Sequence, residues 1–269
     1  MPAGKLPDFL VIGVQKSGTT ALHYNLRRHP EIEVVPNFVD YSRGYTNRKE
    51  TEFFTCVEKP IIATVEQYRS LFNDNGRMQG EVSPNYFSAR ALDKIQQVSP
   101  HSKLIIICRD PVARLESSFN HLMQWRDEHG GEGFQGWFRW SPNQTFEENL
   151  HGEMVAPPRW LKLSTSHEGL VHMGFYDEII DKVLARFSRE QLLILVAEEY
   201  KRNPAETYQK IFDFLGLEQA PIAHTDQHVR EKTFMLSPEQ RATLKEIYRP
   251  HNERFFALIG REIPEWMAG

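Results

Sequence analysis

The sequence is poor in the features that mark several large classes of protein. It has only two cysteines, Cys56 and Cys108, and their spacing fits neither a disulfide framework nor a metal site. Its longest apolar runs, 9–14 and 104–108, are far too short to cross a bilayer. Its first residues lack the apolar core of a signal peptide. We therefore expect a soluble, cytoplasmic chain, or a soluble domain of a larger protein, with its thiols reduced.

The sequence also lacks a strong excess of charge. Lysine and arginine total 32 against 36 aspartate and glutamate, which gives a net charge of −4, and no basic block stands out. A nucleic-acid partner is therefore not indicated. A binding site for an anion must come from a few local cations and backbone amides. The composition, 40% hydrophobic and 25% charged, is ordinary for a globular protein.

What is present is an alternation of short apolar runs with amphipathic segments. The runs predict strands over 8–14, 31–35, 103–108 and 191–196. Helices are predicted over 19–28, 65–72, 88–98, 112–125, 177–186, 204–215 and 238–260, the last broken near Pro250, and 36–49 is predicted to be a loop. This order indicates one α/β domain over 1–269, with a parallel sheet flanked by helices on both faces and strand 8–14 near its centre.

One segment, 125–168, interrupts the alternation. It contains several glycines together with Trp137, Trp140 and Trp160, and no clear period runs through it. We interpret it as an insertion that leaves the core and covers a site. Packing of its aromatic side chains as a separate small core is an equally good interpretation.

The first candidate motif, Gly-Val-Gln-Lys-Ser-Gly-Thr-Thr at 13–20, lies between a predicted strand and a predicted helix. Glycines let the backbone wrap an anion, and a helix N-terminus offers free N–H groups. The candidate contacts are Lys16, Ser17, Gly18, Thr19 and Thr20. The nucleotide-triphosphatase form places lysine after the second glycine, whereas here Thr19 stands there. The alternative is an ordinary turn with a solvated lysine.

The second candidate motif follows strand 103–108. Arg109 stands at the carboxyl end of that strand, where parallel sheets bind ligands. Ser117 lies about two helical turns further on, on the side of Arg114. An arginine fork with a nearby hydroxyl suits a phosphate dianion. The alternative is an ion pair between Arg109 and Asp110.

Together the two motifs resemble the sulfotransferases that use 3′-phosphoadenosine 5′-phosphosulfate (PAPS), in particular the heparan sulfate sulfotransferase branch and its bacterial relatives. QKSGTTAL is similar to the family's 5′-phosphosulfate loop, and IICRDPVARLESSF to its 3′-phosphate motif. Arg109 and Ser117 fall on the two phosphate-contacting positions. Arg230 and Lys232 lie where the family has a basic loop over the 3′-phosphate, although the usual Lys-Gly-Arg pattern is not intact. The resemblance fails across 125–168.

The resemblance implies in-line transfer of a sulfuryl group from PAPS to a hydroxyl or amine, with adenosine 3′,5′-diphosphate as product and no metal required. Lys16 would stabilise the leaving group. When the segment is aligned with the family by its Phe53-Phe54 pair, Glu50 falls at the position of the family's catalytic base. Glu52 falls where some members have histidine. Repulsion between these two acids would raise one pKa. His121 is the rival base. The remaining alternative is that Glu50 and Glu52 are both solvated loop residues with no catalytic role.

The acceptor is less defined by the sequence. Relatives have a lysine near the sulfate in the segment that here reads Glu-Val-Ser-Pro, so Val82 removes one cation from the expected site. Ser83 remains as a contact to cofactor or acceptor. A highly sulfated polymer is therefore disfavoured. Three kinds of acceptor stay open. They are a glycan, a lipid or polyketide-like hydroxyl, either free or carrier-bound, and a small alcohol.

Two functions of other classes remain as alternatives. A metal-dependent P-loop kinase or nucleotide phosphotransferase would need a lysine on the helix and an acid that binds Mg²⁺. A non-catalytic nucleotide-binding module would use the same loop without turnover.

Overall fold

The computed structural model describes residues 4–35, 38–40, 45–55, 62–129, 140–141, 143–155, 169–225 and 233–267. At 38–40, 45–48 and 129 only the backbone is described.

The centre of the structure is a parallel sheet of five strands in the order β2-β5-β1-β6-β7. The strands are β1 (Phe9–Gly13), β2 (Ile32–Val34), β5 (Met78–Val82), β6 (Lys103–Cys108) and β7 (Leu192–Val196). The predicted parallel sheet is confirmed, with β1 in the middle, where an almost wholly apolar strand is covered on both faces. Strand β5 was not predicted, because its sequence Met-Gln-Gly-Glu-Val carries no apolar run.

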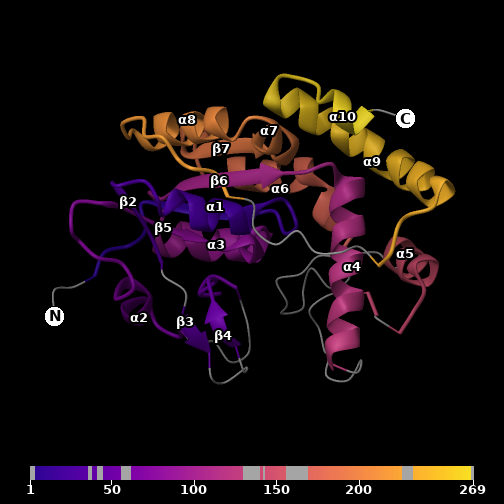
Figure 1. Ribbon diagram of the computed structural model, residues 1–269, viewed down its shortest axis with the longest axis horizontal. Helices are drawn as coiled ribbons and strands as arrows, with labels where there is room; N and C mark the ends of the chain where they lie inside the picture. The colour runs from indigo at the N-terminus through magenta and orange to yellow at the C-terminus, as the bar shows by residue number, and fades with distance from the viewer. Residues whose placement is uncertain are drawn as a thin grey trace.

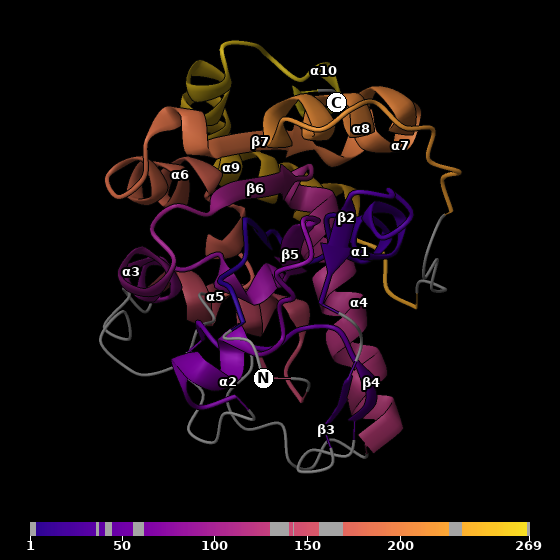
Figure 2. The ribbon, with the colours of Figure 1, turned by 90° about the vertical axis from the view of Figure 1, so that its left-hand side faces the viewer.

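Helices cover both faces of this sheet, as Figure 2 shows. One face carries α1 (Thr19–Leu26), α7 (Ala197–Arg202) and α8 (Pro204–Leu215), and the other carries α3 (Ala89–Val98) and α6 (Tyr176–Leu184). Because side chains alternate along a strand, Phe9 and Val11 pack under α1, whereas Leu10 and Ile12 pack toward α3 and α6. All four side chains are fully buried, so β1 is held from both sides.

A third cluster of apolar side chains lies beside the sheet. Helix α4 (Pro111–His129) leaves the end of β6 and runs away from the sheet (Figure 1). It packs with α5 (Phe146–Val155) and α9 (Pro238–Ile259). The predicted break near Pro250 is wrong. Tyr248 and Phe255 are buried on either side of it, and their packing outweighs the backbone bond that proline removes.

The remaining elements are short. They are β3 (Phe38–Asp40), β4 (Tyr45–Arg48), α2 (Val65–Arg69), α10 (Pro264–Met267) and 3₁₀ turns at Pro84–Tyr86, His172–Gly174 and Arg189–Gln191. The predicted loop 36–49 is wrong in part, because β3 and β4 pair antiparallel. In the predicted insertion 125–168, the first residues extend α4 and the middle forms α5. Within the described ranges, the helices are too short or too polar to span a membrane.

Candidate active site

The loop between β1 and α1 has the geometry of an anion cradle. A Cβ on Gly13 would lie 2.8 Å from Cβ of Phe87, so only glycine fits there. Gly18 adopts φ 96° as the N-cap of α1, a conformation that favours glycine. No side chain caps this helix, and its first turn holds no acidic residue. Its N-terminal amides and positive dipole end are therefore available to an anion.

Two residues outside the glycines have left-handed backbone in the described part of the chain. They are Lys16, at φ 67°, and Glu52, at φ 54°. Such conformations cost about 1–3 kcal/mol each and cluster at functional sites. Both are residues that the sequence singles out for chemistry.

The two predicted motifs meet in space. Nη1 of Arg109 donates to the carbonyl oxygen of Lys16 at 3.0 Å. Beneath this contact, the N–H of Val14 donates to the carbonyl of Ile107 at 3.0 Å, which continues the pairing of β1 with β6. The hydroxyl of Tyr176 donates to the carbonyl of Arg109 at 2.6 Å and fixes the turn after β6. The loop and the arginine therefore lie at one edge of the sheet.

That edge is the topological switch point. From β1 the chain crosses by α1 on one face toward β2, whereas from β6 it reaches β7 by way of α6 on the other face. Strands whose connections leave to opposite faces form a crevice at their carboxyl ends, where open α/β sheets bind ligands. Arg109 and Lys16 follow the two adjacent strands β6 and β1 and stand at this crevice.

Two buried hydroxyls near the same edge fit an anionic ligand. Oγ of Ser17 and Oγ of Ser83 are buried and have no hydrogen-bond partner within the described ranges. Ser83 follows β5, and its N–H donates to the carbonyl of Val11 at 2.9 Å. A buried hydroxyl without a hydrogen-bond partner destabilises the fold by about 1–3 kcal/mol. A hydrogen bond to a phosphate or sulfate oxygen would offset this penalty.

The segment with the predicted base is anchored by a glutamate whose role the sequence did not reveal. Glu81, on β5, is fully buried. Its carboxylate accepts from the N–H and Oγ1 of Thr51 at 3.0 and 2.7 Å. It also accepts from the hydroxyls of Tyr68 and Tyr86 at 2.7 and 2.9 Å. Burial raises the pKa of Glu81. These bonds fix Thr51, and hence its neighbour Glu50, against β5.

The two predicted acids have different surroundings. The Glu50 side chain is 23% exposed, and Oε1 lies 2.5 Å from Nζ of Lys49. Glu52 is buried and accepts from Nδ2 of Asn85 at 3.2 Å. Asn85 in turn accepts from Nε2 of Gln15, in the phosphate loop. Glu52 is thus linked to the cradle, whereas Glu50 is the acid that solvent reaches.

The remaining candidates lie on or beyond α4. Ser117 and His121 are partly exposed, one turn apart on the same helix. Arg114 is fully buried instead, where it donates to Oγ of Ser118 at 3.2 Å and to the carbonyl of Leu170. It therefore supports the fold. Arg230 and Lys232 lie outside the described residues.

Asp110 directly precedes α4 beside the crevice. Its Oδ1 accepts from the N–H of Val112 at 3.0 Å, and its own N–H donates to Oε1 of Glu198 at 3.0 Å. Burial raises the pKa of Asp110 to about 6. The guanidinium of Arg109 donates to the carbonyl of Lys16, and its positive charge opposes the rise in the pKa of Asp110.

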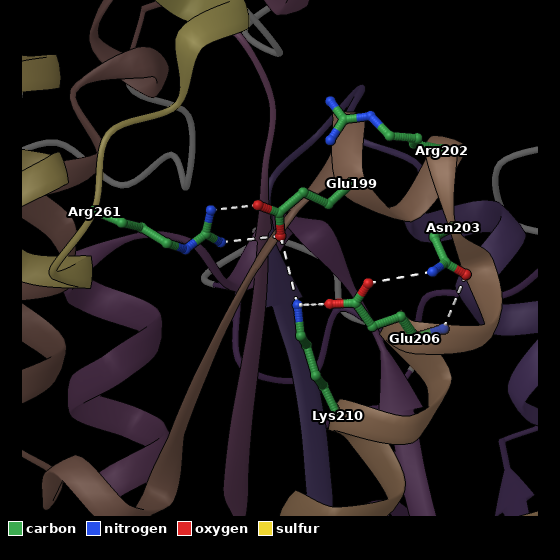
Figure 3. Close-up of a pocket in the computed structure, with 6 residues that line it drawn as sticks. All are labelled: Glu199, Arg202, Asn203, Glu206, Lys210 and Arg261. Atoms are coloured by element: carbon green, nitrogen blue, oxygen red, sulfur yellow. Dashed lines mark hydrogen bonds and ion pairs between the residues drawn. The ribbon is translucent and has the colours of Figure 1, made fainter.

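A surface cavity of about 390 Å³ lies elsewhere, against α7, α8 and Arg261 (Figure 3). Most of its charges are paired with one another, and Arg202 is paired with Glu265 outside the lining. Arg261 binds Glu199 with both terminal nitrogens, and Lys210 lies 2.9 Å from Glu206. None of the predicted site residues lines this cavity.

The comparisons with known proteins agree with this geometry. The profile of the sulfotransferase domain family matches residues 6–256. The chain belongs to the sulfotransferase family. That result confirms the family resemblance expected from the sequence, and it gives no support to the kinase alternative.

Named sulfotransferases match nearly the whole chain. Mouse heparan sulfate glucosamine 3-O-sulfotransferase 3B1 is 26% identical over 96% of this chain and 64% of its own length. Human heparan sulfate glucosamine 3-O-sulfotransferase 6 is 27% identical over 96% of this chain and 73% of its own. Mouse bifunctional heparan sulfate N-deacetylase/N-sulfotransferase 4 is 27% identical over 97% and 31%. The chain thus spans less than two thirds of the length of two of these three relatives.

Solved structures support the fold. A sulfotransferase from Alicyclobacillus acidocaldarius matches with a TM-score of 0.70 and 24% identity, over 97% of this chain and 99% of that one. The sulfotransferase domain of the Synechococcus PCC 7002 olefin synthase matches with a TM-score of 0.50 and 15% identity, over 92% and 97%. The α/β architecture is therefore that of known sulfotransferases.

Proposed function

We propose that this chain transfers a sulfuryl group from PAPS to a hydroxyl or amine of an acceptor. The observation that supports this best is the bond from Arg109 to the carbonyl of Lys16. It brings two anion-binding motifs to one crevice, where a nucleotide with anionic groups at both ends can reach both. The uncapped N-terminus of α1 and the buried hydroxyls of Ser17 and Ser83 fit such a ligand.

Each motif has one part in this proposal. PAPS, when bound, supplies a sulfuryl group on a phosphate leaving group. The amides after Gly18, with Ser17, Thr19 and Thr20, hold the 5′ side. Arg109 and Ser117 hold the 3′-phosphate, with Arg230 and Lys232 as further cations. Lys16 places its charge at the oxygen that leaves, where negative charge grows in the transition state.

The proton of the acceptor needs a base. We assign Glu50, because it is the more exposed of the two acids and stands next to the anchored Thr51. As the acceptor oxygen or nitrogen bonds to sulfur, its proton passes to Glu50 and the bond from sulfur to the phosphate oxygen breaks. Glu52 and Ser83 lie on the acceptor side, and His121 is the competing base.

The acceptor class follows in part from the relatives. The named relatives are heparan sulfate 3-O- and N-sulfotransferases. Another structural neighbour is the sulfotransferase domain of the curacin biosynthetic pathway. Val82 is fully buried where the heparan sulfate branch has lysine, so it adds no charge to the site. We therefore propose a weakly charged acceptor, such as a glycan, a polyketide-like or lipid hydroxyl, or a small alcohol.

One binding experiment tests the nucleotide assignment. Adenosine 3′,5′-diphosphate should raise the melting temperature of the wild-type chain in the presence of EDTA, since the proposed site uses no metal. ATP with Mg²⁺ should have less effect. Stabilisation by ATP with Mg²⁺ alone would favour a phosphotransferase. A Lys16→Met variant that still binds adenosine 3′,5′-diphosphate but fails to consume labelled PAPS would distinguish an enzyme from a binding module.

A further inference from the structure

A bridge of side-chain hydrogen bonds joins the loop 13–20, here called the phosphate loop, to residues 50–55, which contain both predicted acids and are here called the acidic segment. Nε2 of Gln15 donates to Oδ1 of Asn85, and Nδ2 of Asn85 donates to Oε1 of Glu52 at 3.2 Å. The three residues come from the loop after β1, the 3₁₀ turn after β5 and the segment before α2. The bridge therefore spans from the proposed donor side of the site to its acceptor side.

The residue in the middle must be an amide. Asn85 uses its oxygen as acceptor toward Gln15 and its nitrogen as donor toward Glu52. A carboxylate offers only acceptors, and an apolar side chain offers neither function. The side chain of Glu52 is buried, so its charge depends on donors such as this one.

The bridge joins two strained points of the backbone. Gln15 directly precedes Lys16, and both Lys16 and Glu52 have left-handed φ. Such conformations persist where surrounding contacts hold them. On the Lys16 side, Arg109 supplies one such contact. On the Glu52 side, the Oγ1 of Thr55 donates to the Glu52 carbonyl at 2.7 Å.

The acidic segment is thus held at two points. Thr51 is fixed to the buried Glu81, which belongs to the sheet, and Glu52 is linked through Asn85 to the loop. Glu50 directly precedes this pair. A change in the loop would reach the carboxylates by way of Asn85, whereas the bonds of Glu81 attach the segment to the sheet.

We propose that Asn85 is a positioning residue that couples the phosphate loop to the acidic segment. Occupation of the loop by the nucleotide orders Gln15, and the bridge passes that order to Glu52 and the adjacent Glu50. The acceptor-side carboxylates are then placed only when the donor site is filled. This inference rests on the proposed function, because it takes the loop as the nucleotide site.

Hydrogen exchange with adenosine 3′,5′-diphosphate as the probe tests the coupling without an acceptor. In the wild type, saturating nucleotide should slow amide exchange across 50–55 by about fivefold or more, the lower range for coupled sites. Asn85→Ala should bind the nucleotide with an affinity within about threefold of wild type yet lose this slowing. Gln15→Met, which breaks the bridge from its other end, should behave alike.

The controls separate coupling from general loosening. Asn75 also donates to a glutamate, Glu33, at 2.7 Å, but it precedes β5 at the opposite end of the sheet. Asn75→Ala should keep the response. Asn85→Asp sets two carboxylates against each other and should abolish it. Adding Glu52→Gln restores a donor opposite the new acceptor, so the double variant should regain the slowing.

Three results would decide against the coupling. These are a wild type that binds nucleotide without slowed exchange at 50–55, an Asn85→Ala variant that keeps the slowing, and a double variant that does not recover it while melting like the wild type. A wild type that fails to bind adenosine 3′,5′-diphosphate would instead overturn the proposed function itself.

Discussion

Arg109 and Lys16 are joined by a hydrogen bond of 3.0 Å from a guanidinium nitrogen to a main-chain carbonyl oxygen. The two residues are far apart in the sequence, and each belongs to a separate anion-binding motif. Because the acceptor is the backbone, the bond fixes the path of the loop whatever the lysine side chain does. An arginine has five N–H donors, so this bond leaves capacity for a phosphate.

Replacement of Arg109 by lysine should therefore weaken nucleotide binding. Lysine keeps the charge but cannot both hold the Lys16 carbonyl and grip a phosphate with two parallel donors. The loss of charge-assisted bonds worth about 1.5–3 kcal/mol corresponds to a roughly 10- to 150-fold lower affinity for adenosine 3′,5′-diphosphate in calorimetry. Arg186→Lys, which alters a surface pair with Asp93, is the matched control. Equal affinities for the two variants would exclude a phosphate role for Arg109.

Replacement of Glu50 by glutamine should strongly reduce turnover and spare nucleotide binding. Loss of a general base lowers turnover by roughly 10²- to 10⁴-fold. Transfer of label from PAPS should fall by this amount, while affinity for adenosine 3′,5′-diphosphate stays unchanged. His121→Ala is the comparison. If the histidine variant loses turnover and Glu50→Gln does not, the base is on α4.

The sequence predicts the sheet where strands are buried on both faces. β1, β6 and β7 are continuous apolar runs, so the sequence alone predicts that they are buried strands and where they begin and end. β5 is different, since Gln79, Gly80 and Glu81 break the run. Glu81 is tolerated there because four donors from other segments meet it, and Gly80 because Phe9 packs where its Cβ would lie. Such compensation is visible only in three dimensions.

The same limit applies to the site. Each phosphate motif is local, so glycine spacing and the position of Arg109 after a strand predicted both. The links between segments are not local. Asn85 and Glu52 are separated by 33 positions, and Thr51 and Glu81 by 30. No spacing rule relates such pairs, so the bridge and the anchor became evident only with the structure. Arg230 and Lys232 stay predictions.

Gly18→Ala should destabilise the loop and impair binding. At φ 96° an L side chain costs about 1–2 kcal/mol. Urea unfolding should show this loss, and the melting shift produced by adenosine 3′,5′-diphosphate should shrink. Gly152→Ala is a sharp control, because Gly152 lies in α5 with open space around its Cβ position. That change should stabilise the chain by about 0.5–1 kcal/mol. The same sign of effect at both positions would contradict the argument.

Glu81→Gln should destabilise the chain even though the two side chains have the same shape. The Glu81 carboxylate accepts four hydrogen bonds. The amide nitrogen of glutamine is itself a donor, so it could not accept the bonds on its side of the group. We expect a loss of about 2–4 kcal/mol in urea unfolding, with faster amide exchange at Thr51. Glu33→Gln, at a partly exposed glutamate that also accepts hydrogen bonds, should cost less than about 1 kcal/mol. A small effect at Glu81 would mean that the acidic segment is not anchored there.

Asp110 gives the chain a pH dependence whose sign can be worked out. Its pKa is raised by burial from 3.8 to about 6, so the folded state holds this proton more tightly than the unfolded state. Stability from this group is greatest below pH 4 and falls as pH rises to about 6, by at most about 3 kcal/mol. Asp110→Asn keeps an oxygen for the N–H of Val112 and removes the titration. The free energy of unfolding of the variant, measured with urea, should therefore rise relative to that of the wild type between pH 4 and pH 7. If the difference between the two free energies stays constant over this range, Asp110 ionises normally.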